Sequence, residues 1–275
     1  LNGLSGKAIP ILWESIPFAY AGYGKSFSNI PTLFIESARM YRGSSPIDLG
    51  VDALGGAIAF QENNLAPKGT HLKSSLELSS FYTQEFATIY QDSLRKGMYL
   101  KFQSSYTNAR NDYEVGGGSN KKVYVVDANY KKQYQKVKNF HNAFKHILLR
   151  PSLTWHKKNT NTSVWTSFTH LYKQLQHNRF DPEIVVGAAD WSSNQYHIGM
   201  RHSYKAFSEE SPSFDFKITF TKENLHLCDT SYNAYNWKGD IVTRKTTAGE
   251  LIPHKNQPFY TTYTTDKLYA SSQLK

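Results

Sequence analysis

The sequence has very little cysteine and no long apolar run, and these two absences exclude several classes of protein. Cys228 is the single cysteine among 275 residues, so no disulfide framework can form within the chain. Cys-x-x-Cys pairs and Cys/His clusters with the spacing of zinc ligands are also missing. No stretch approaches the ~18 consecutive apolar residues that a membrane-spanning helix needs. Disulfide-rich modules, zinc modules and helical integral membrane proteins are therefore excluded.

Sequence signatures of catalysis are also absent. There is no Gly-x-Ser-x-Gly elbow and no His-Glu-x-x-His pair. Gly24-Lys25-Ser26 resembles the end of a phosphate-binding loop, but Ala19 stands where that loop requires glycine. The ten histidines are dispersed along the chain. We therefore expect no enzyme activity, no catalytic residue, no cofactor and no metal site.

The chain is basic, with 32 Lys and Arg against 22 Asp and Glu and a formal net charge of +10. The basic residues occur as short scattered pairs, such as Lys121-Lys122 and Lys157-Lys158, and no nucleic-acid-binding motif accompanies them. We expect no nucleic-acid partner. Solvated loops are the favoured interpretation of these pairs, and contact with anionic lipid or lipopolysaccharide is the second option.

Aromatic residues are abundant: 19 Tyr, 16 Phe and 5 Trp stand in a chain that is only 39% hydrophobic. This mixture favours extended structure with one apolar and one wet face. A soluble β-sandwich and an outer-membrane β-barrel both fit the composition.

Strict two-residue alternation supports the β prediction. Phe214, Phe216, Ile218 and Phe220 alternate with polar residues, and successive side chains of a strand point to opposite faces. Comparable segments are 72–80, 98–106, 146–156 and 196–204. Their length exceeds the ~5–6 residues of typical soluble strands and matches the ~9–11 residues that cross a bilayer. Aromatic residues at segment ends fit an interfacial girdle; they are Tyr82, Tyr90, Tyr106, Trp155, Trp165, Tyr196 and Tyr204.

Long polar stretches separate the alternating segments, over residues 108–138, 176–194 and 229–257. Polar loops of this length are rare in compact soluble domains, whereas outer-membrane barrels carry long loops on one side. The pattern of apolar and polar residues also changes near residues 61–69. Short apolar runs with Gly and Pro precede this boundary, and long alternation follows it.

The most specific pattern is Arg42-Gly43 followed by Ala53-Leu54-Gly55-Gly56-Ala57-Ile58. These residues resemble the end of the plug domain of TonB-dependent outer-membrane receptors. Adjacent glycines allow close backbone approach where a plug meets a barrel wall. The chain departs from the family pattern at Glu14-Ser15-Ile16-Pro17, where the family usually has an Asp-Gly-hydrophobic-Pro turn.

The resemblance implies a mainly β fold: a partial transmembrane antiparallel β-barrel preceded by part of a small mixed α/β plug domain. Residues 1–64 would form the C-terminal half of the plug, and residues 65–275 the N-terminal portion of the barrel. The chain begins with Leu, lacks a signal sequence and is too short for a barrel of about 22 strands, so we expect a fragment of a longer receptor.

The implied function is energy-coupled uptake of a scarce, bulky nutrient across the outer membrane of a Gram-negative cell. The implied partners are a TonB-type energy-transducing inner-membrane complex, outer-membrane lipid and a small-molecule or metal-chelate ligand. A ferric siderophore is favoured over cobalamin or an oligosaccharide because Tyr20, Tyr23 and Lys25 could bind it by stacking and charge. Predicted lumen-facing residues are Lys101, Gln103, Arg201, Asp215 and Lys217.

Two other functions remain open from the sequence. A passive porin would share the barrel but would not need the first 64 residues. A soluble β-rich carbohydrate-binding module would use the same exposed Tyr and Trp side chains. A second sheet packed on the Phe214–Phe220 ridge would favour the soluble module and exclude the transporter.

Overall fold

The computed structural model describes residues 9–24, 26–43, 56–62, 69–116, 123–126, 129–177, 183–205, 212–251 and 259–274. Almost all of the regular structure is β, as the sequence predicts. Three 3-10 turns supply the helical component of the described residues: η2 (Phe18–Tyr20), η3 (Phe27–Asn29) and η4 (Thr32–Phe34). No helix among these residues has the length and apolar character needed to cross a membrane.

A small four-stranded sheet comes first in the chain. Its strands are β1 (Ile11–Trp13), β2 (Ile16–Pro17), β3 (Ile35–Arg42) and β4 (Gly56–Glu62), in the order β2-β1-β4-β3. β1 pairs with β4 in parallel, and the other pairs are antiparallel. β1 and β2 are joined by Glu14 and Ser15, both of which have positive φ, at 51° and 60°.

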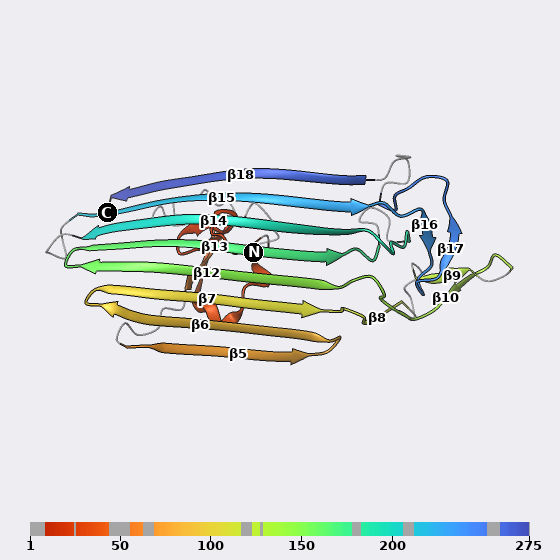
Figure 1. Ribbon diagram of the computed structural model, residues 1–275, viewed down its shortest axis with the longest axis horizontal. Helices are drawn as coiled ribbons and strands as arrows, with labels where there is room; N and C mark the ends of the chain where they lie inside the picture. The colour runs from red at the N-terminus through yellow and green to blue at the C-terminus, as the bar shows by residue number, and fades with distance from the viewer. Residues whose placement is uncertain are drawn as a thin grey trace.

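A large antiparallel sheet of eight strands follows. The strands are β5 (His71–Ser79), β6 (Thr83–Arg95), β7 (Met98–Ala109), β12 (Phe144–Lys157), β13 (Thr160–Gln174), β14 (Asp190–Lys205), β15 (Ser213–Asp229) and β18 (Phe259–Leu274). Chain neighbours pair throughout, so the sheet is an up-and-down meander with β5 and β18 at its edges (Figure 1). All five segments predicted by alternation are strands. β6, β13 and β18 lack clean alternation and were not predicted from the sequence.

The two faces of the large sheet differ in the way that the alternation predicts. On β15, Lys217, Thr219 and Thr221 are buried, whereas Phe214, Ile218 and Phe220 are exposed. The exposed face also carries large apolar side chains on all the remaining long strands apart from β13. They include Leu76, Phe86, Tyr106, Leu149, Tyr196, Ile198, Met200 and Leu268. The prediction that Trp165 belongs to an interfacial girdle is wrong, because its side chain lies on the opposite, buried face and is only 7% exposed.

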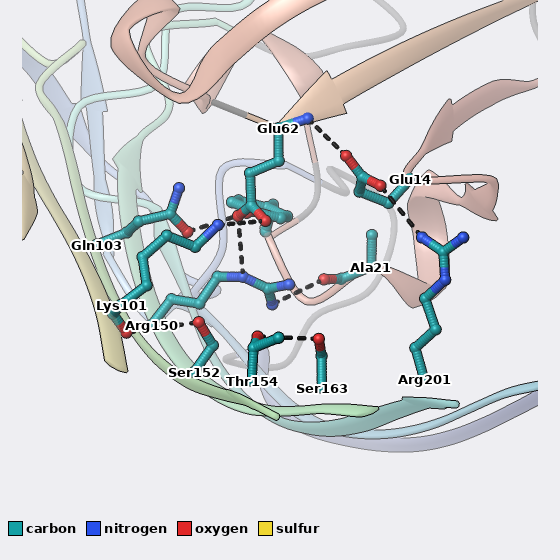
Figure 2. Close-up of polar contacts among 11 residues, drawn as sticks. Glu14, Ala21, Glu62, Lys101, Gln103, Arg150, Ser152, Thr154, Ser163 and Arg201 are labelled. Carbon is teal, nitrogen blue, oxygen red and sulfur yellow. Dashed lines mark hydrogen bonds and ion pairs between the residues drawn. The ribbon is translucent and has the colours of Figure 1, made fainter. Parts of the chain in front are cut away.

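The small sheet packs against the buried face of the large one, which curves around it (Figures 1 and 2). Their shared core includes Trp13, Tyr23 and Phe34 from the first part of the chain. Ile89 and Leu148 come from the large eight-stranded sheet, which we call the wall. Among the described residues, the small sheet therefore lies on the face opposite the Phe214–Phe220 ridge. This arrangement is the one that the barrel hypothesis requires.

The two ends of the large sheet are unlike. β6–β7 and β12–β13 are joined by two-residue turns at one end, whereas the long polar stretches all lie at the other end (Figure 1). These stretches contain β8 (Glu114–Val115), β9 (Tyr124–Val126), β10 (Lys132–Tyr134), β11 (Val137–Lys138), β16 (Asn233–Tyr235) and β17 (Ile241–Arg244). Val123, Val137 and Trp237 form a small core of their own there.

Candidate functional site

The contact between the two sheets contains a cavity of about 410 Å³. Carboxylates of the first part of the chain face cations of the wall across it; the charged residues are Glu14, Glu62, Lys101, Arg150 and Arg201. Hydroxyl groups of Ser152, Thr154 and Ser163 complete the wall (Figure 2). The cavity thus has a polar lining that joins elements far apart in the sequence.

Glu62 is the centre of this contact. It ends β4, is 8% exposed, and its carboxylate lies 2.8 Å from the ammonium of Lys101 and 3.7 Å from Nε of Arg150. The Tyr23 hydroxyl donates a 2.5 Å hydrogen bond to it. A buried charge needs such partners, because desolvation alone would cost several kcal/mol.

The surroundings shift the acidities of Glu62 and Tyr23 in opposite directions. Burial would raise the pKa of the Glu62 carboxyl, but the charges of Lys101 and Arg150 outweigh burial and lower that pKa to about 2. Burial raises the pKa of the Tyr23 phenol well above its ordinary value, and the neighbouring Glu62 charge adds to this. Glu62 is therefore an anion and Tyr23 a neutral donor across the physiological range.

Arg150, on β12, binds the first part of the chain in three ways. Its guanidinium carbon lies 4.6 Å from the Tyr23 ring centroid, and its Nη1 donates to the Ala21 carbonyl oxygen at 3.3 Å. The third contact is the Glu62 ion pair. On its own wall, Arg150 lies 5.2 Å from the Trp165 ring centroid. Guanidinium groups suit such sites because they stack on rings and keep their charge when buried.

Glu14 forms a second charged contact. One carboxylate oxygen accepts the Glu62 backbone N–H at 2.8 Å, and the other lies 3.4 Å from Nη1 of Arg201. Arg201 also donates two 3.1 Å hydrogen bonds to Asp215, whose carboxylate lies 3.3 Å from the Lys217 ammonium. The Glu14-Ser15 turn has positive φ at both residues and aims the Glu14 carboxylate at the wall.

Glycines allow the 21–24 turn to touch the wall directly. Gly22 and Gly24 have φ of 78° and 92°, which side-chain-bearing residues rarely adopt. A Cβ on Gly22 would collide with the ring of His197. The Ser167 hydroxyl donates to the Gly22 carbonyl oxygen at 2.5 Å, and the Gly24 N–H donates to Gln195 at 3.2 Å.

The predicted substrate-binding residues have different positions. Tyr23 is fully buried in the contact just described, and Tyr20 lies with its ring centroid 5.6 Å from that of Tyr269 on β18. Lys25 lies outside the described residues. A role in substrate binding stays a prediction for all three.

The predicted plug motif falls partly outside the described residues, where Ala53, Leu54 and Gly55 belong. Arg42 and Gly56 face each other at the ends of β3 and β4, and Gly43 follows directly. Gly56 has φ of 105°, and a Cβ there would collide with the Tyr41 carbonyl oxygen. The close backbone approach at Gly56 is therefore to β3 within the small sheet, and not to the wall as the sequence predicted.

The predicted lumen-facing residues share one face of the wall. Lys101, Arg201 and Asp215 belong to the charged contacts, and Gln103 and Lys217 are buried beside them. Sequence reasoning missed Glu62 and Arg150 as functional residues. Arg150 could have been predicted to face the lumen, since it follows the outward-facing Leu149 in a predicted strand. No sequence pattern pointed to Glu62.

No protein-family model and no curated protein sequence matches the chain. Solved structures do match. A ferric enterobactin receptor (PfeA) variant from Pseudomonas aeruginosa superposes with a TM-score of 0.66 at 11% identity, over 100% of this chain and 39% of that one. The copper transporter OprC gives a TM-score of 0.62 at 12% identity, over 100% of this chain and 36% of that one.

A third match is the siderophore receptor PiuA from Acinetobacter baumannii, with a TM-score of 0.57 at 12% identity over 85% of this chain and 32% of that one. These proteins are TonB-dependent receptors. The chain has the fold of the TonB-dependent outer-membrane receptors. The predicted family resemblance is thereby confirmed for the fold, and the chain spans about two fifths of the length of the first two receptors.

Proposed function

We propose that the chain is part of an outer-membrane receptor that imports a scarce nutrient with energy from a TonB-type inner-membrane complex. In this proposal residues 1–64 belong to a plug and residues 65–275 to a transmembrane barrel in a Gram-negative cell. The observation that carries it is the contrast between the two faces of the eight-stranded sheet. The small sheet covers the inner face, whereas the outer face exposes apolar side chains. Lipid covers the outer face, because bilayer hydrocarbon is the solvent that such a band requires.

The charged contact gives the plug its hold on the wall. Glu62 and Glu14 on the plug side face Lys101, Arg150 and Arg201 on the wall side. Transport requires that ligand binding and the energy-transducing partner favour a state in which this contact is loosened. No covalent chemistry is needed.

For the ligand we propose a metal chelate, with a ferric siderophore favoured over cobalamin or an oligosaccharide. One cation–aromatic pair at the long-loop end supports an anionic, aromatic chelate: the Lys132 ammonium lies 4.1 Å from the Tyr124 ring centroid. Tyr20, Tyr23 and Lys25 remain the proposed contacts on the plug; Tyr23 would become available only after its contact with Glu62 opens.

The two alternatives have less support. A passive porin has no use for a small sheet bound to its inner wall by ion pairs. A soluble carbohydrate-binding module would leave no apolar face of this extent uncovered by a second layer.

Deleting residues 1–64 from the natural full-length protein tests the gated receptor against the porin. We expect large leak conductance in planar bilayers from the deletion variant and almost none from the parent. Equal conductance of both proteins would contradict the plug. Extraction from membranes by buffer without detergent would contradict the barrel, and growth of a knockout strain on single iron sources, corrinoids or glycans would identify the ligand class.

A further inference from the structure

We propose that a cleft at the long-loop end of β5, β6 and β7 binds a neutral hexose ring of a surface glycan. The cleft measures about 440 Å³ and is lined by side chains of the β5–β6 turn and of residues 112–114. It lies apart from the cavity between the sheets and shares no lining residue with it. A pocket of this size that presents aromatic rings and a few polar groups is a common form of ligand site.

Three aromatic rings are held in place around the cleft while remaining open to solvent. Phe81, Tyr82 and Tyr113 are 49%, 61% and 39% exposed. The Phe81 and Tyr113 rings meet edge to face, 5.5 Å apart between centroids. The Arg110 guanidinium covers one face of Tyr82 at 4.4 Å, and its backbone N–H donates to the Phe81 carbonyl oxygen at 3.3 Å. The rings are therefore pre-positioned without being buried.

The turn that presents these rings is built from unfavourable residues. Phe81 and Tyr82 have φ of 61° and 55°, and the Thr83 N–H donates to the Ser80 carbonyl oxygen at 3.3 Å across them. A β-turn with positive φ at both central positions favours Asn-Gly, and a bulky residue there costs about 1–2 kcal/mol. Strain of this kind persists where the strained side chains have a use, and here that use is the display of two rings.

The polar groups of the cleft select the ligand chemistry. Asp112 and Glu114 supply carboxylate oxygens, which only accept hydrogen bonds, and Lys138 supplies a donor. The charges of Lys138 and of Arg110 beside Tyr82 balance those of the two carboxylates, so the cleft offers an anionic chelate no net attraction. Sugar hydroxyls donate to carboxylates, and the apolar C–H face of a hexose stacks on aromatic rings. The cleft thus fits a neutral sugar and differs from the proposed import site, so it does not depend on the import ligand.

The test uses the natural full-length protein in detergent and neutral glucose, galactose and mannose oligosaccharides, followed by saturation-transfer NMR and calorimetry. We expect binding by the wild type and by Tyr130→Ala, which removes an aromatic ring that is 90% exposed elsewhere. The double variant Phe81→Asn/Tyr82→Gly suits the turn better. It should fold with equal or higher stability and bind at least 10-fold more weakly.

Asp112→Asn combined with Glu114→Gln leaves the rings in place and should weaken binding at least 3-fold. Failure of every oligosaccharide to bind, or equal binding by the Asn-Gly turn variant, would overturn the proposal. Competition with vesicles that carry lipopolysaccharide with a complete core, compared with vesicles of lipid A alone, then identifies the source. Displacement by the complete core alone shows a membrane glycolipid, and no displacement shows a free glycan.

Discussion

Two buried carboxylates hold two different parts of this molecule together, and they are stabilised by different partners. Glu62 joins the small sheet to the wall through the cations Lys101 and Arg150. Glu250, at the long-loop end, is 1% exposed and accepts hydrogen bonds from consecutive backbone N–H groups of residues 187, 188 and 189, at 2.9, 2.9 and 3.1 Å. One contact is charge against charge, and the other is charge against fixed dipoles.

The pKa values of the two groups move in opposite directions as a result. Lys101 and Arg150 overcome the effect of burial and lower the pKa of Glu62 to about 2. For Glu250, burial is the larger effect and raises the pKa, although the N–H groups of Gly187 and Ala188 oppose it. Acid therefore weakens the contact at Glu62 and not the one at Glu250.

Other neutral donors strengthen the long-loop end. Asp229 accepts the backbone N–H groups of Glu250 and Leu251 at 2.7 and 2.8 Å, and Gln176 accepts those of Phe140 and His141, both at 2.8 Å. Three segments distant in sequence are thereby joined. The proposed function would use this division, because a plug could then loosen at the ionic contact while the dipolar contact keeps the loops in shape.

The largest expected effect comes from Glu62→Gln. This change leaves the Lys101 and Arg150 charges buried without their anion, which costs about 3–5 kcal/mol when one partner of a buried pair is removed. We expect hydrogen exchange of residues 11–24 to accelerate by more than 100-fold, while exchange of residues 186–189 stays unchanged. Glu36→Gln, an exposed carboxylate of the same small sheet, is the matched control. Equal exchange in both variants would show that the ion pairs do not hold the sheet.

The converse change is Glu250→Ala. It removes the acceptor from three N–H groups, at about 1–3 kcal/mol for each group that water cannot reach. Exchange should accelerate at residues 186–189 and leave residues 11–24 unaffected. Asp240→Asn, at an exposed position of the same connection, should change neither region. Acceleration in both regions after Glu250→Ala would show that the two contacts are coupled and would break the comparison.

Acid should separate the two contacts within one sample. The stabilisation from Glu62 is complete above its ordinary pKa of 4.5 and is lost as the pH falls toward about 2. Folded Glu250 binds its proton more tightly than the unfolded chain does, so its contribution grows as the pH falls. Fluorine NMR of 5-fluorotryptophan-labelled protein reports both, because Trp13 lines the inner cavity and Trp237 lies in the loop core.

We expect the Trp13 signal to broaden or shift below pH 4.5 before the Trp237 signal changes. Glu62→Gln serves as the control, since Trp13 should then be insensitive over the same range. A Trp237 signal that changes first would reverse the assignment of acid sensitivity.

The sequence predicted the wall better than the contact on it. Alternation is a local property, so the faces of β7, β14 and β15 could be assigned from residues such as Phe214 and Lys217. The partners of Glu62 could not be predicted from the sequence. Lys101 and Arg150 lie 39 and 88 residues away from it, and only the pairing of β7 with β12 in the sheet brings them together. Trp165 was misassigned for a related reason: its strand contains polar residues on both faces, so Val164 and Trp165 gave no clear alternation.

The smallest expected effect concerns the arm that carries Glu14. Ser15 has φ of 60° in the turn between β1 and β2. Ser15→Gly removes about 1–2 kcal/mol of left-handed strain and costs about 0.4–1 kcal/mol of unfolded-state entropy. We therefore expect a net gain of about 0.5 kcal/mol, seen as slower exchange of residues 11–17, with the Glu14–Arg201 contact retained. Ser28→Gly, in the 3-10 turn η3, should instead destabilise, because Ser28 lacks positive φ and its hydroxyl lies 2.7 Å from that of Ser26. Destabilisation by Ser15→Gly would show that the Ser15 side chain supports the Glu14 carboxylate by more than backbone geometry.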